Sequence, residues 1–519
     1  MSLARSFATV GGFTMASRVL GFVRDILIAA VLGTGPVADA FFVAFRFPNL
    51  FRRLFAEGAF NSAFVPLFAR ELEGGGVAAA RRFAEQAAAV LLWTLLAVTA
   101  IAEIAMPWLM YLLAPGFAED SEKFDLAILL TRITFPYLLC MSLVALVSGV
   151  LNTLGRFAAA AAAPVLLNIV LIGVLVMLYA VGDDGTALSG KSLAWGVSAA
   201  GFLQLAMLLF AARRAAMRFS IVRPRLTKQV KRLIALGIPG VISGGVTQVN
   251  IVIGTIIASL QAGAVSYLYY AERVYQLPLG VVGIAIGVVL LPDLSRRLRA
   301  GREDGAHWSQ NRSLEFAMLL TLPAAVALAV VSTPIIQVLF ERGAFLSDDV
   351  RPVALALMAF AAGLPAFVLI KVFQPGFFAR EDTRTPMRYA AVSVAVNVAG
   401  SLVLFIPLGH IGIAIATSLA GWVNAALLVG TLSRRGHFAV DAPLRSRLQR
   451  IVFAALLMGL ALWLCAWMME AWLTAPAIVV RALALALLVA LGMGLYAAAA
   501  QLTGAFDLRQ LREMLGRGG

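Results

Sequence analysis

The sequence is poor in the residues from which metal centres, disulfide frameworks and charged soluble surfaces are built. It contains two cysteines and three histidines among 519 residues, and 13% of its residues are charged, against roughly 25% in soluble domains. Cys140 and Cys465 both fall in apolar segments, which argues against a disulfide framework or a thiolate metal site. His307, His410 and His437 lack the paired spacing of metal ligands. We therefore expect no metal site and no cofactor.

Enzyme motifs are also missing from the sequence. There is no Walker A loop and no DxxD-type carboxylate cluster, so we expect no catalytic residue and no ATP drive within this chain. The glycine-rich run at 280–287 has small residues at helical spacing, which favours helix packing in lipid over phosphate binding. A membrane enzyme or a scaffold of envelope assembly is therefore the least favoured class.

Apolar residues dominate what is present. They make up 61% of the chain, and the mean hydropathy is +0.91. Because about 20 apolar residues cross a bilayer as a helix, the sequence predicts an all-α polytopic membrane protein with about 14 transmembrane helices. Pro48 and Gly58 interrupt the second apolar segment, which we expect to bend or to end in a surface helix. The predicted spans are 8–32, 37–68, 85–113, 124–152, 158–181, 192–213, 229–260, 264–294, 312–340, 350–378, 387–408, 411–433, 449–472 and 477–502.

The net charge of +15 comes from basic residues that gather in alternate loops. The loops at 213–232, 296–302 and 434–450 are rich in arginine, whereas those at 33–36 and 182–191 contain little lysine or arginine. The positive-inside rule places the basic loops and both termini in the cytoplasm. Topology thus explains the net charge without a nucleic-acid partner, and leaves open a role in holding anionic membrane lipids.

The chain repeats itself at an offset of 227–229 residues. The segment 38–55 aligns with 265–282, which places Arg46 on Arg273, and three proline pairs match at nearly the same offset. Such repeats are typical of transporters that work by alternating access, and they predict two pseudo-symmetric six-helix lobes around a central cavity. The expected divisions are a first lobe at 1–213, a basic cytoplasmic linker at 214–226, a second lobe at 227–435, two extra helices at 446–504 and a cytoplasmic tail at 505–519.

The first two spans carry charged residues at positions where an ion costs at least about 2.5–3.5 kcal/mol. At the repeat offset, Arg18, Arg24 and Asp25 fall on Gly245, Ile251 and Val252, so the fold itself does not require these charges. They form either internal ion pairs or a site for an anion, and the excess of arginine favours a diphosphate. The candidate binding residues are Arg18, Arg24, Asp25, Asp39, Arg46, Arg52, Arg53, Glu57 and, from the second lobe, Arg273.

Two segments resemble one known family. The stretch 17–68, which begins SRVLGFVRDILIAAVLGTGPVADAFF, and the stretch 269–296, which begins YYAERVYQLPLG, are similar to the MurJ (MviN) family of bacterial lipid II flippases. The resemblance implies an inner-membrane exporter of the MOP superfamily that moves an undecaprenyl-diphosphate-linked peptidoglycan precursor to the periplasmic leaflet. It implies cavity arginines at Arg18, Arg24, Arg52 and Arg273, with acidic partners Asp25 and Asp39. It also implies that the last two helices form an apolar groove for the lipid tail.

Some members of that family hold sodium with carboxylates in the second lobe. Here the corresponding spans contain Asn250 and Asn397 but no acidic residue, so membrane potential or a cation gradient is the expected drive. The expected partners are lipid II, membrane lipids and the peptidoglycan synthesis machinery. The rival hypothesis is a related exporter of another polyprenyl-linked glycan or of drugs.

Overall fold

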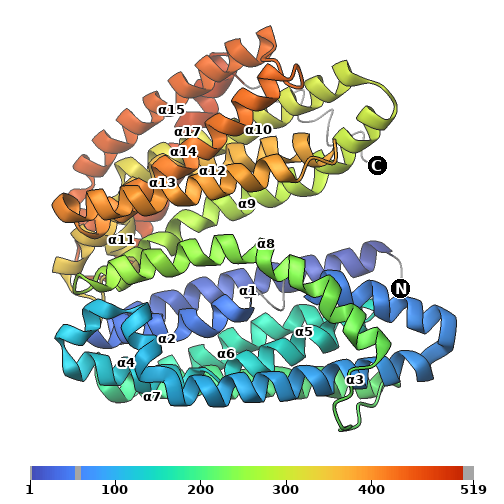
Figure 1. Cartoon of the computed structure of the whole chain (residues 1–519). Helices are drawn as coiled ribbons and strands as arrows, with labels where there is room; N and C mark the ends of the chain where they lie inside the picture. The colour runs from blue at the N-terminus through green and yellow to red at the C-terminus, as the bar shows by residue number, and fades with distance from the viewer. Residues whose placement is uncertain (1–2, 53–59, 506–519) are drawn as a thin grey trace. The chain divides into compact units, whose positions relative to one another are not determined.

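The computed structural model describes residues 3–52 and 60–505 (Figure 1). Of the candidate site residues, Arg53 and Glu57 lie outside the described residues, and the side chain of Arg52 is not described. The expected tail at 505–519 is likewise outside them beyond Ala505.

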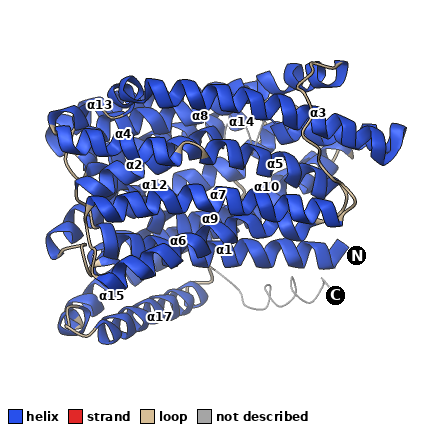
Figure 2. Cartoon of the chain, turned by 90° about the horizontal axis from the view of Figure 1, so that it is seen from below, coloured by secondary structure: helices blue, strands red, loops and turns tan. Residues whose placement is uncertain are grey.

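The described chain is helical throughout, which confirms the predicted class (Figure 2). The exception within these residues is one isolated antiparallel bridge between Arg342 and Phe345. The chain divides into two compact units. The first runs to Ser266 and also contains Arg342–Phe345, and the second contains Tyr267–Glu341 and the chain from Leu346 onward.

The first unit is built from eight described α-helices and one short 3-10 helix. They are α1 (Leu3–Leu32), α2 (Pro36–Arg52), α3 (Phe60–Leu113), η2 (Pro115–Glu119), α4 (Ser121–Thr134), α5 (Tyr137–Thr153), α6 (Phe157–Val181), α7 (Ala187–Arg214) and α8 (Lys228–Ser259). Helix α2 continues through Pro48, so the helix does not end there. Helix α3 instead kinks at Gly76, whose φ of 68° is in the left-handed region that glycine tolerates.

Helix α9 begins in the last residues of the first unit and continues into the second, which contains the remaining helices. From α9 onward, the helices are α9 (Ala264–Arg299), α10 (Glu303–Val330), α11 (Ser332–Phe340), α12 (Ser347–Phe378), α13 (Arg384–Leu408), α14 (His410–Arg434), α15 (Ala442–Met468), α16 (Glu470–Leu473) and α17 (Ile478–Leu502). Ten helical segments of the described chain are long and apolar enough to cross a membrane, each coinciding with a predicted span. The other predicted spans fall on α1, α2 with the start of α3, α8 and α9, so the count of about fourteen is matched approximately.

The two compact units divide after Ser266, and the predicted lobes and the linker 214–226 stay predictions. Helix α8, which we expected to open the second lobe, packs against α3 and belongs to the first unit. The reason is a close approach of backbones: a Cβ added to Gly116 would lie 2.2 Å from the carbonyl oxygen of Ser259. The Gly116 amide also donates to Ser259 Oγ at 3.2 Å. The repeat and its pseudo-symmetry stay predictions.

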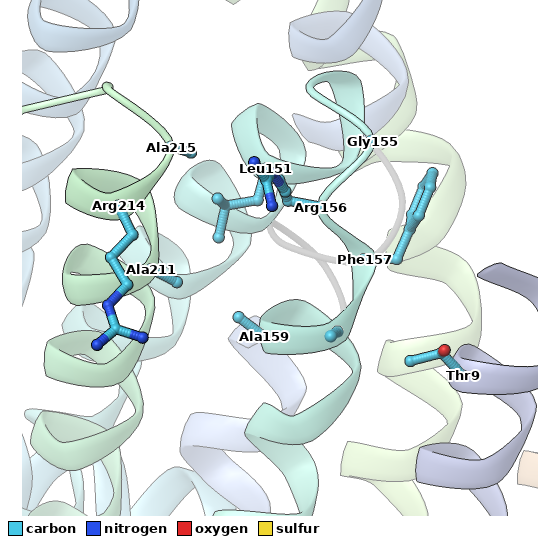
Figure 3. A pocket seen from close by; sticks show the side chains of 10 residues that line it. Thr9, Leu151, Gly155, Arg156, Phe157, Ala159, Ala211, Arg214 and Ala215 are labelled. Carbon is cyan, nitrogen blue, oxygen red and sulfur yellow. The ribbon is translucent and has the colours of Figure 1, made fainter. Parts of the chain in front are cut away.

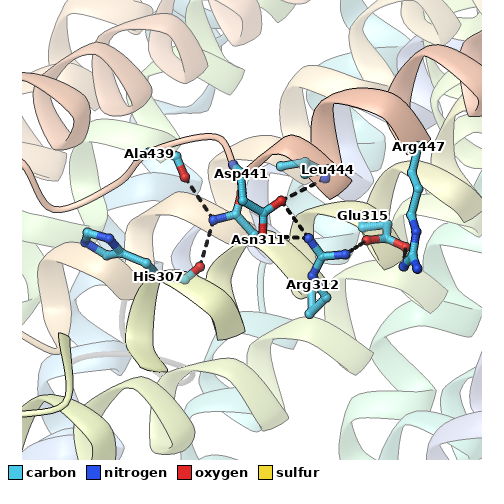
Figure 4. A network of polar contacts seen from close by, with 8 residues as sticks. All are labelled: His307, Asn311, Arg312, Glu315, Ala439, Asp441, Leu444 and Arg447. Atoms are coloured by element: carbon cyan, nitrogen blue, oxygen red, sulfur yellow. Dashed lines mark hydrogen bonds and ion pairs between the residues drawn. The ribbon is translucent and has the colours of Figure 1, made fainter. Parts of the chain in front are cut away.

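The extra helix α15 is tied to α10 by a network of polar contacts (Figure 4). Arg312 on α10 donates to both carboxylate oxygens of Asp441 at 2.7 and 2.8 Å and also pairs with Glu315. Arg447 on α15 donates to the other oxygen of Glu315 at 2.6 Å. Asn311 donates to the Ala439 carbonyl at 2.9 Å, so the end of the short connection before α15 is held at two residues.

Candidate functional site

Arg24 and Asp25 on α1 form a buried ion pair. The guanidinium donates to Asp25 Oδ1 from Nη2 at 2.7 Å and from Nε at 3.1 Å. The two side chains point about 100° apart on a helix, so helical spacing did not predict this pair. It forms because the long arginine side chain folds back along its own helix. Arg24 is 8% exposed and Asp25 3%, and such burial favours pairing of the two charges.

A second helix holds the same arginine. Arg24 Nη1 donates to Asn168 Oδ1 on α6 at 2.9 Å, and Asn168 Nδ2 donates to the Ser17 carbonyl at 2.9 Å. The Arg24 guanidinium carbon also lies 5.7 Å from the centre of the Phe45 ring. In the sequence, the only notable feature of Asn168 is that it falls on Asn397 at the repeat offset. The structure shows that it positions a candidate binding residue.

Asp39, in the first turn of α2, is fully buried and accepts four hydrogen bonds. Lys123 Nζ and the Gly263 amide donate to Oδ2 at 2.7 and 2.9 Å. The hydroxyl and the amide of Ser266 donate to Oδ1 at 2.6 and 3.0 Å. Lys123 also lies 4.0 Å from the centre of the Phe117 ring. Sequence analysis missed Lys123 because a single lysine in a loop with several acids carries no sign of burial.

The end of α1 is held by a second contact. Ala344 donates its amide to the Ala30 carbonyl at 2.8 Å, and the Gly185 amide donates to the Val31 carbonyl at 2.6 Å. Glycine is required at two positions here: a Cβ on Gly33 would lie 2.2 Å from the Ala344 oxygen. A Cβ on Gly343 would lie 2.2 Å from the Ala30 oxygen.

We call these two contacts the latch: Asp39 with Gly263 and Ser266, and Ala30 with Ala344. Both use the adjoining ends of α1 and α2. Both also bind short segments of the first unit. In sequence, Gly263–Ser266 directly precedes the second unit and Arg342–Phe345 interrupts it. Because the bonds are buried and one acceptor is charged, the latch is a stable rather than an incidental contact.

The other candidate arginines lie in different settings. Arg46 on α2 is half-buried and donates to Thr255 Oγ1 on α8 at 3.2 Å. Arg18 on α1 is exposed and makes no hydrogen bond or ion pair with any residue that the structure describes. Arg273 belongs to the second unit, and its guanidinium carbon lies 4.7 Å from the centre of the Tyr269 ring.

The described residues therefore divide the expected charges into two groups. Asp25 and Asp39 are neutralised by cations of the same unit, Arg24 and Lys123, as the ion-pair interpretation requires. Arg18 on α1 lies outside these pairs among the described residues. Among the described residues, no group of three histidine, cysteine or acidic side chains is placed to hold a metal ion.

Known proteins resemble this chain over nearly its whole length. The family model described as lipid II flippase MurJ matches residues 28–482. A probable lipid II flippase MurJ from Rhizobium meliloti is 53% identical, covering 100% of this chain and 97% of the relative. A lipid II flippase MurJ from Burkholderia cenocepacia is 36% identical, covering 89% of this chain and 90% of the relative.

Solved structures agree on the fold. A lipid II flippase MurJ in an inward closed conformation matches with a TM-score of 0.77 at 24% identity, covering 95% of this chain and 98% of that one. An inward-facing multidrug resistance MATE transporter of the MOP superfamily matches with a TM-score of 0.63 at 15% identity, covering 81% of this chain and 95% of that one. The match of the family model and the full-length relatives decide the matter: this chain belongs to the lipid II flippase MurJ family.

Proposed function

We propose that this chain is a lipid II flippase, which moves an undecaprenyl-diphosphate-linked peptidoglycan precursor from the cytoplasmic to the periplasmic leaflet. The observation that carries the proposal is the charge balance of α1 and α2. Asp25 and Asp39 each have a cationic partner, Arg24 and Lys123, whereas Arg18 is exposed and makes no ion pair with any residue that the structure describes. Guanidinium groups suit a diphosphate because each presents a planar fork of donors.

The buried pairs suggest how binding and movement are connected. Arg24 shares α1 with the exposed Arg18 and is held in place by Asn168. A diphosphate that approaches α1 competes with Asp25 for the Arg24 guanidinium, because both are oxyanions. We therefore assign Arg18 to first capture of the headgroup and Arg24 to a later, tighter contact. Arg46, Arg52 and Arg53 of the second span, with Glu57 and the repeat-related Arg273, stay candidates for the same site.

The contacts of the latch, all within the first unit, are the ones that we propose to change during the transport cycle. Asp39 accepts three hydrogen bonds from Gly263 and Ser266, and at about 1.5–3 kcal/mol each, breaking them costs roughly 4.5–9 kcal/mol. Membrane potential can supply this free energy if several charges move, since each charge moved is worth about 2.3 kcal/mol per 100 mV. A cation gradient is the alternative drive, and no step in this scheme needs a catalytic residue or a bound cofactor.

The proposal includes a location and partners. The ten apolar helices support a multi-pass membrane protein, and the arginine-rich loops support cytoplasmic termini in the inner membrane. Lipid II is the proposed substrate, with the last two helices, α15 and α17, offering an apolar surface for its tail. We also propose contact with the peptidoglycan synthesis machinery.

Depletion and complementation in a bacterial strain test this function. The chain should rescue growth of a flippase-depleted strain and restore lipid II to the periplasmic face, as read by a probe that cannot cross the membrane. Arg18→Ala and Arg24→Glu should lose that exposure while the protein is still made. If the wild-type chain is inserted but never rescues, the substrate is another polyprenyl-linked glycan or a drug, and lipid II is abandoned.

A matched control separates the site from a general need for membrane arginines. Arg132 on α4 donates to the Glu103 carbonyl at 3.0 Å and touches none of the candidate site residues. Arg132→Gln should therefore complement like the wild type. Equal loss in Arg132→Gln and Arg24→Glu would remove the assignment of the site to α1.

A further inference from the structure

We propose that the first unit holds the phosphodiester of an anionic phospholipid in a pocket between the start of α6 and the end of α7. The pocket has a volume of about 350 Å³, and its lining includes neither a latch residue nor Arg24 or Asp25. Figure 3 shows the pocket from close by. Ten residues line it: Thr9, Leu151, Gly155, Arg156, Phe157, Ala158, Ala159, Ala211, Arg214 and Ala215. Nothing in the proposed function requires this pocket.

The loop between α5 and α6 shapes one side of the pocket. Gly155 has a φ of 72°, and the Arg156 amide donates back to the Leu151 carbonyl at 2.8 Å, which closes the end of α5. Arg156 then stands at the N-cap of α6 with no side-chain capping bond. The first amides of α6 are therefore left without a side-chain acceptor, and the helix end carries partial positive charge.

The end of α7 supplies the second cation. Arg214 lies in the last turn of α7, and its guanidinium carbon is 4.5 Å from the centre of the Phe210 ring. Figure 3 shows that Arg156 and Arg214 come from different elements, with Ala211 beside Arg214 and Leu151 near Arg156. Both arginines are exposed, and neither forms an ion pair with any residue in the described part of the chain. Two guanidiniums without carboxylate partners beside a helix N-terminus suit a phosphate group.

The rest of the lining favours a lipid over a soluble anion. Apart from the two arginines and Thr9, the lining side chains are apolar or absent, and Leu151 is fully buried. The pocket lies at the ends of α6 and α7, two helices long and apolar enough to cross a membrane. Basic pockets at such helix ends hold anionic headgroups, whose glycerol and first methylenes pack on the apolar lining.

Lipid binding to the purified full chain in detergent micelles tests the proposal. Phosphatidylglycerol should bind to the wild type at least about tenfold more tightly than to the Arg156→Gln/Arg214→Gln variant. The control variant Arg213→Gln/Arg218→Gln removes two exposed arginines of the same region that do not line the pocket, and should bind like the wild type. Equal loss in both double variants would overturn the proposal, because it would mean a general charge effect.

Two further measurements distinguish a site for an anionic lipid from a simple anion site. Phosphatidylcholine should show no difference between the wild type and either variant, and inorganic phosphate should fail to displace phosphatidylglycerol. Full displacement by inorganic phosphate would mean a simple anion site and would overturn the lipid assignment. If the double arginine variant does not fold, Ala159→Leu serves instead, since it fills the pocket but keeps both charges. Unchanged phosphatidylglycerol binding by Ala159→Leu would also overturn the proposal.

Discussion

Lys123 Nζ lies 2.7 Å from Asp39 Oδ2, and both side chains are buried although 84 residues separate them in sequence. The pair joins α4 to the first turn of α2. A buried carboxylate without a cation is expensive. Lys123 supplies that cation beside Asp39, which also accepts hydrogen bonds from the segment that leads into α9. The lysine thus supports the latch without being part of it.

Lys123→Met should destabilise the protein by about 3–5 kcal/mol, because it leaves the Asp39 carboxylate buried and unpaired. The double variant Lys123→Met/Asp39→Asn should recover part of that loss, since the uncompensated charge is gone. Unfolding of the purified protein in detergent measures both. Lys231→Met, at an exposed position in α8, is the control. Equal stability of the two lysine variants would show that the pair is absent in solution.

Gly33→Ala should open the contact between α1 and the segment Arg342–Phe345. The new Cβ would lie 2.2 Å from the Ala344 oxygen, and the φ of 61° at Gly33 is strained for alanine. Hydrogen exchange of the Ala344 amide, which donates to the Ala30 carbonyl, should then become at least about tenfold faster. Gly35→Ala has open space around its Cβ and should exchange like the wild type. Exchange in Gly33→Ala as slow as in the wild type would contradict the close approach of these two backbones.

Arg312→Met should loosen the connection before α15. The arginine bonds both Asp441 and Glu315, and Asp441 also caps α15 by accepting from the Leu444 amide at 2.7 Å. Each lost bond to a charged group costs about 1.5–3 kcal/mol. Limited proteolysis between residues 436 and 441 should become faster. Arg445→Met, an exposed neighbour outside the network, should leave the cleavage rate unchanged.

The loop between α12 and α13 should show a pH-dependent contribution to stability. The guanidinium of Arg435, together with the amide and hydroxyl of Thr385, lowers the pKa of Asp382 to about 2. The unfolded chain has a pKa of about 3.9 at this position. A lowered pKa in the folded state stabilises the protein above pH ~4, and this contribution is lost as the pH falls toward 2.

The measurement is the difference in thermal midpoint between the wild type and Asp382→Asn. The difference should be present at pH 7, shrink below about pH 4 and vanish near pH 2. Glu73→Gln, at an exposed position without a partner among the described residues, should show no such difference at any of these values. A constant difference for Asp382→Asn across this range would mean that the ion pair with Arg435 does not form.

Much of the fold was predictable because apolar runs indicate membrane-spanning helices and basic loops indicate the cytoplasmic side. The ten apolar helices overlap predicted spans. The reason is that a backbone in lipid must satisfy its own hydrogen bonds, which an α-helix does within one segment. The kink at Gly76 falls in the predicted connection between the spans 37–68 and 85–113, but the helical structure on both sides of it was not predicted. The packing of α8 in the first unit involves the approach of Gly116 to Ser259, which no local sequence signal encodes.

The site was predictable in its residue types but not in its pairings. An ionised side chain inside a membrane-spanning segment costs free energy and therefore indicates a functional role. Arg24, Asp25 and Asp39 were candidates from the sequence alone for this reason. Their partners were not: Asn168 lies 144 residues from Arg24, and Ser266 lies 227 residues from Asp39. Contacts over such separations depend on helix packing.

By itself, the sequence determined that this protein is a helical membrane protein with an excess of arginine in its first two spans, because composition and periodicity are local properties. Only the tertiary structure decided that Asp25 and Asp39 of those spans form ion pairs within the protein, and that the partner of Asp39 is Lys123 rather than an arginine. The physical reason is that a buried charge takes whichever opposite charge the packing of helices brings within bonding distance.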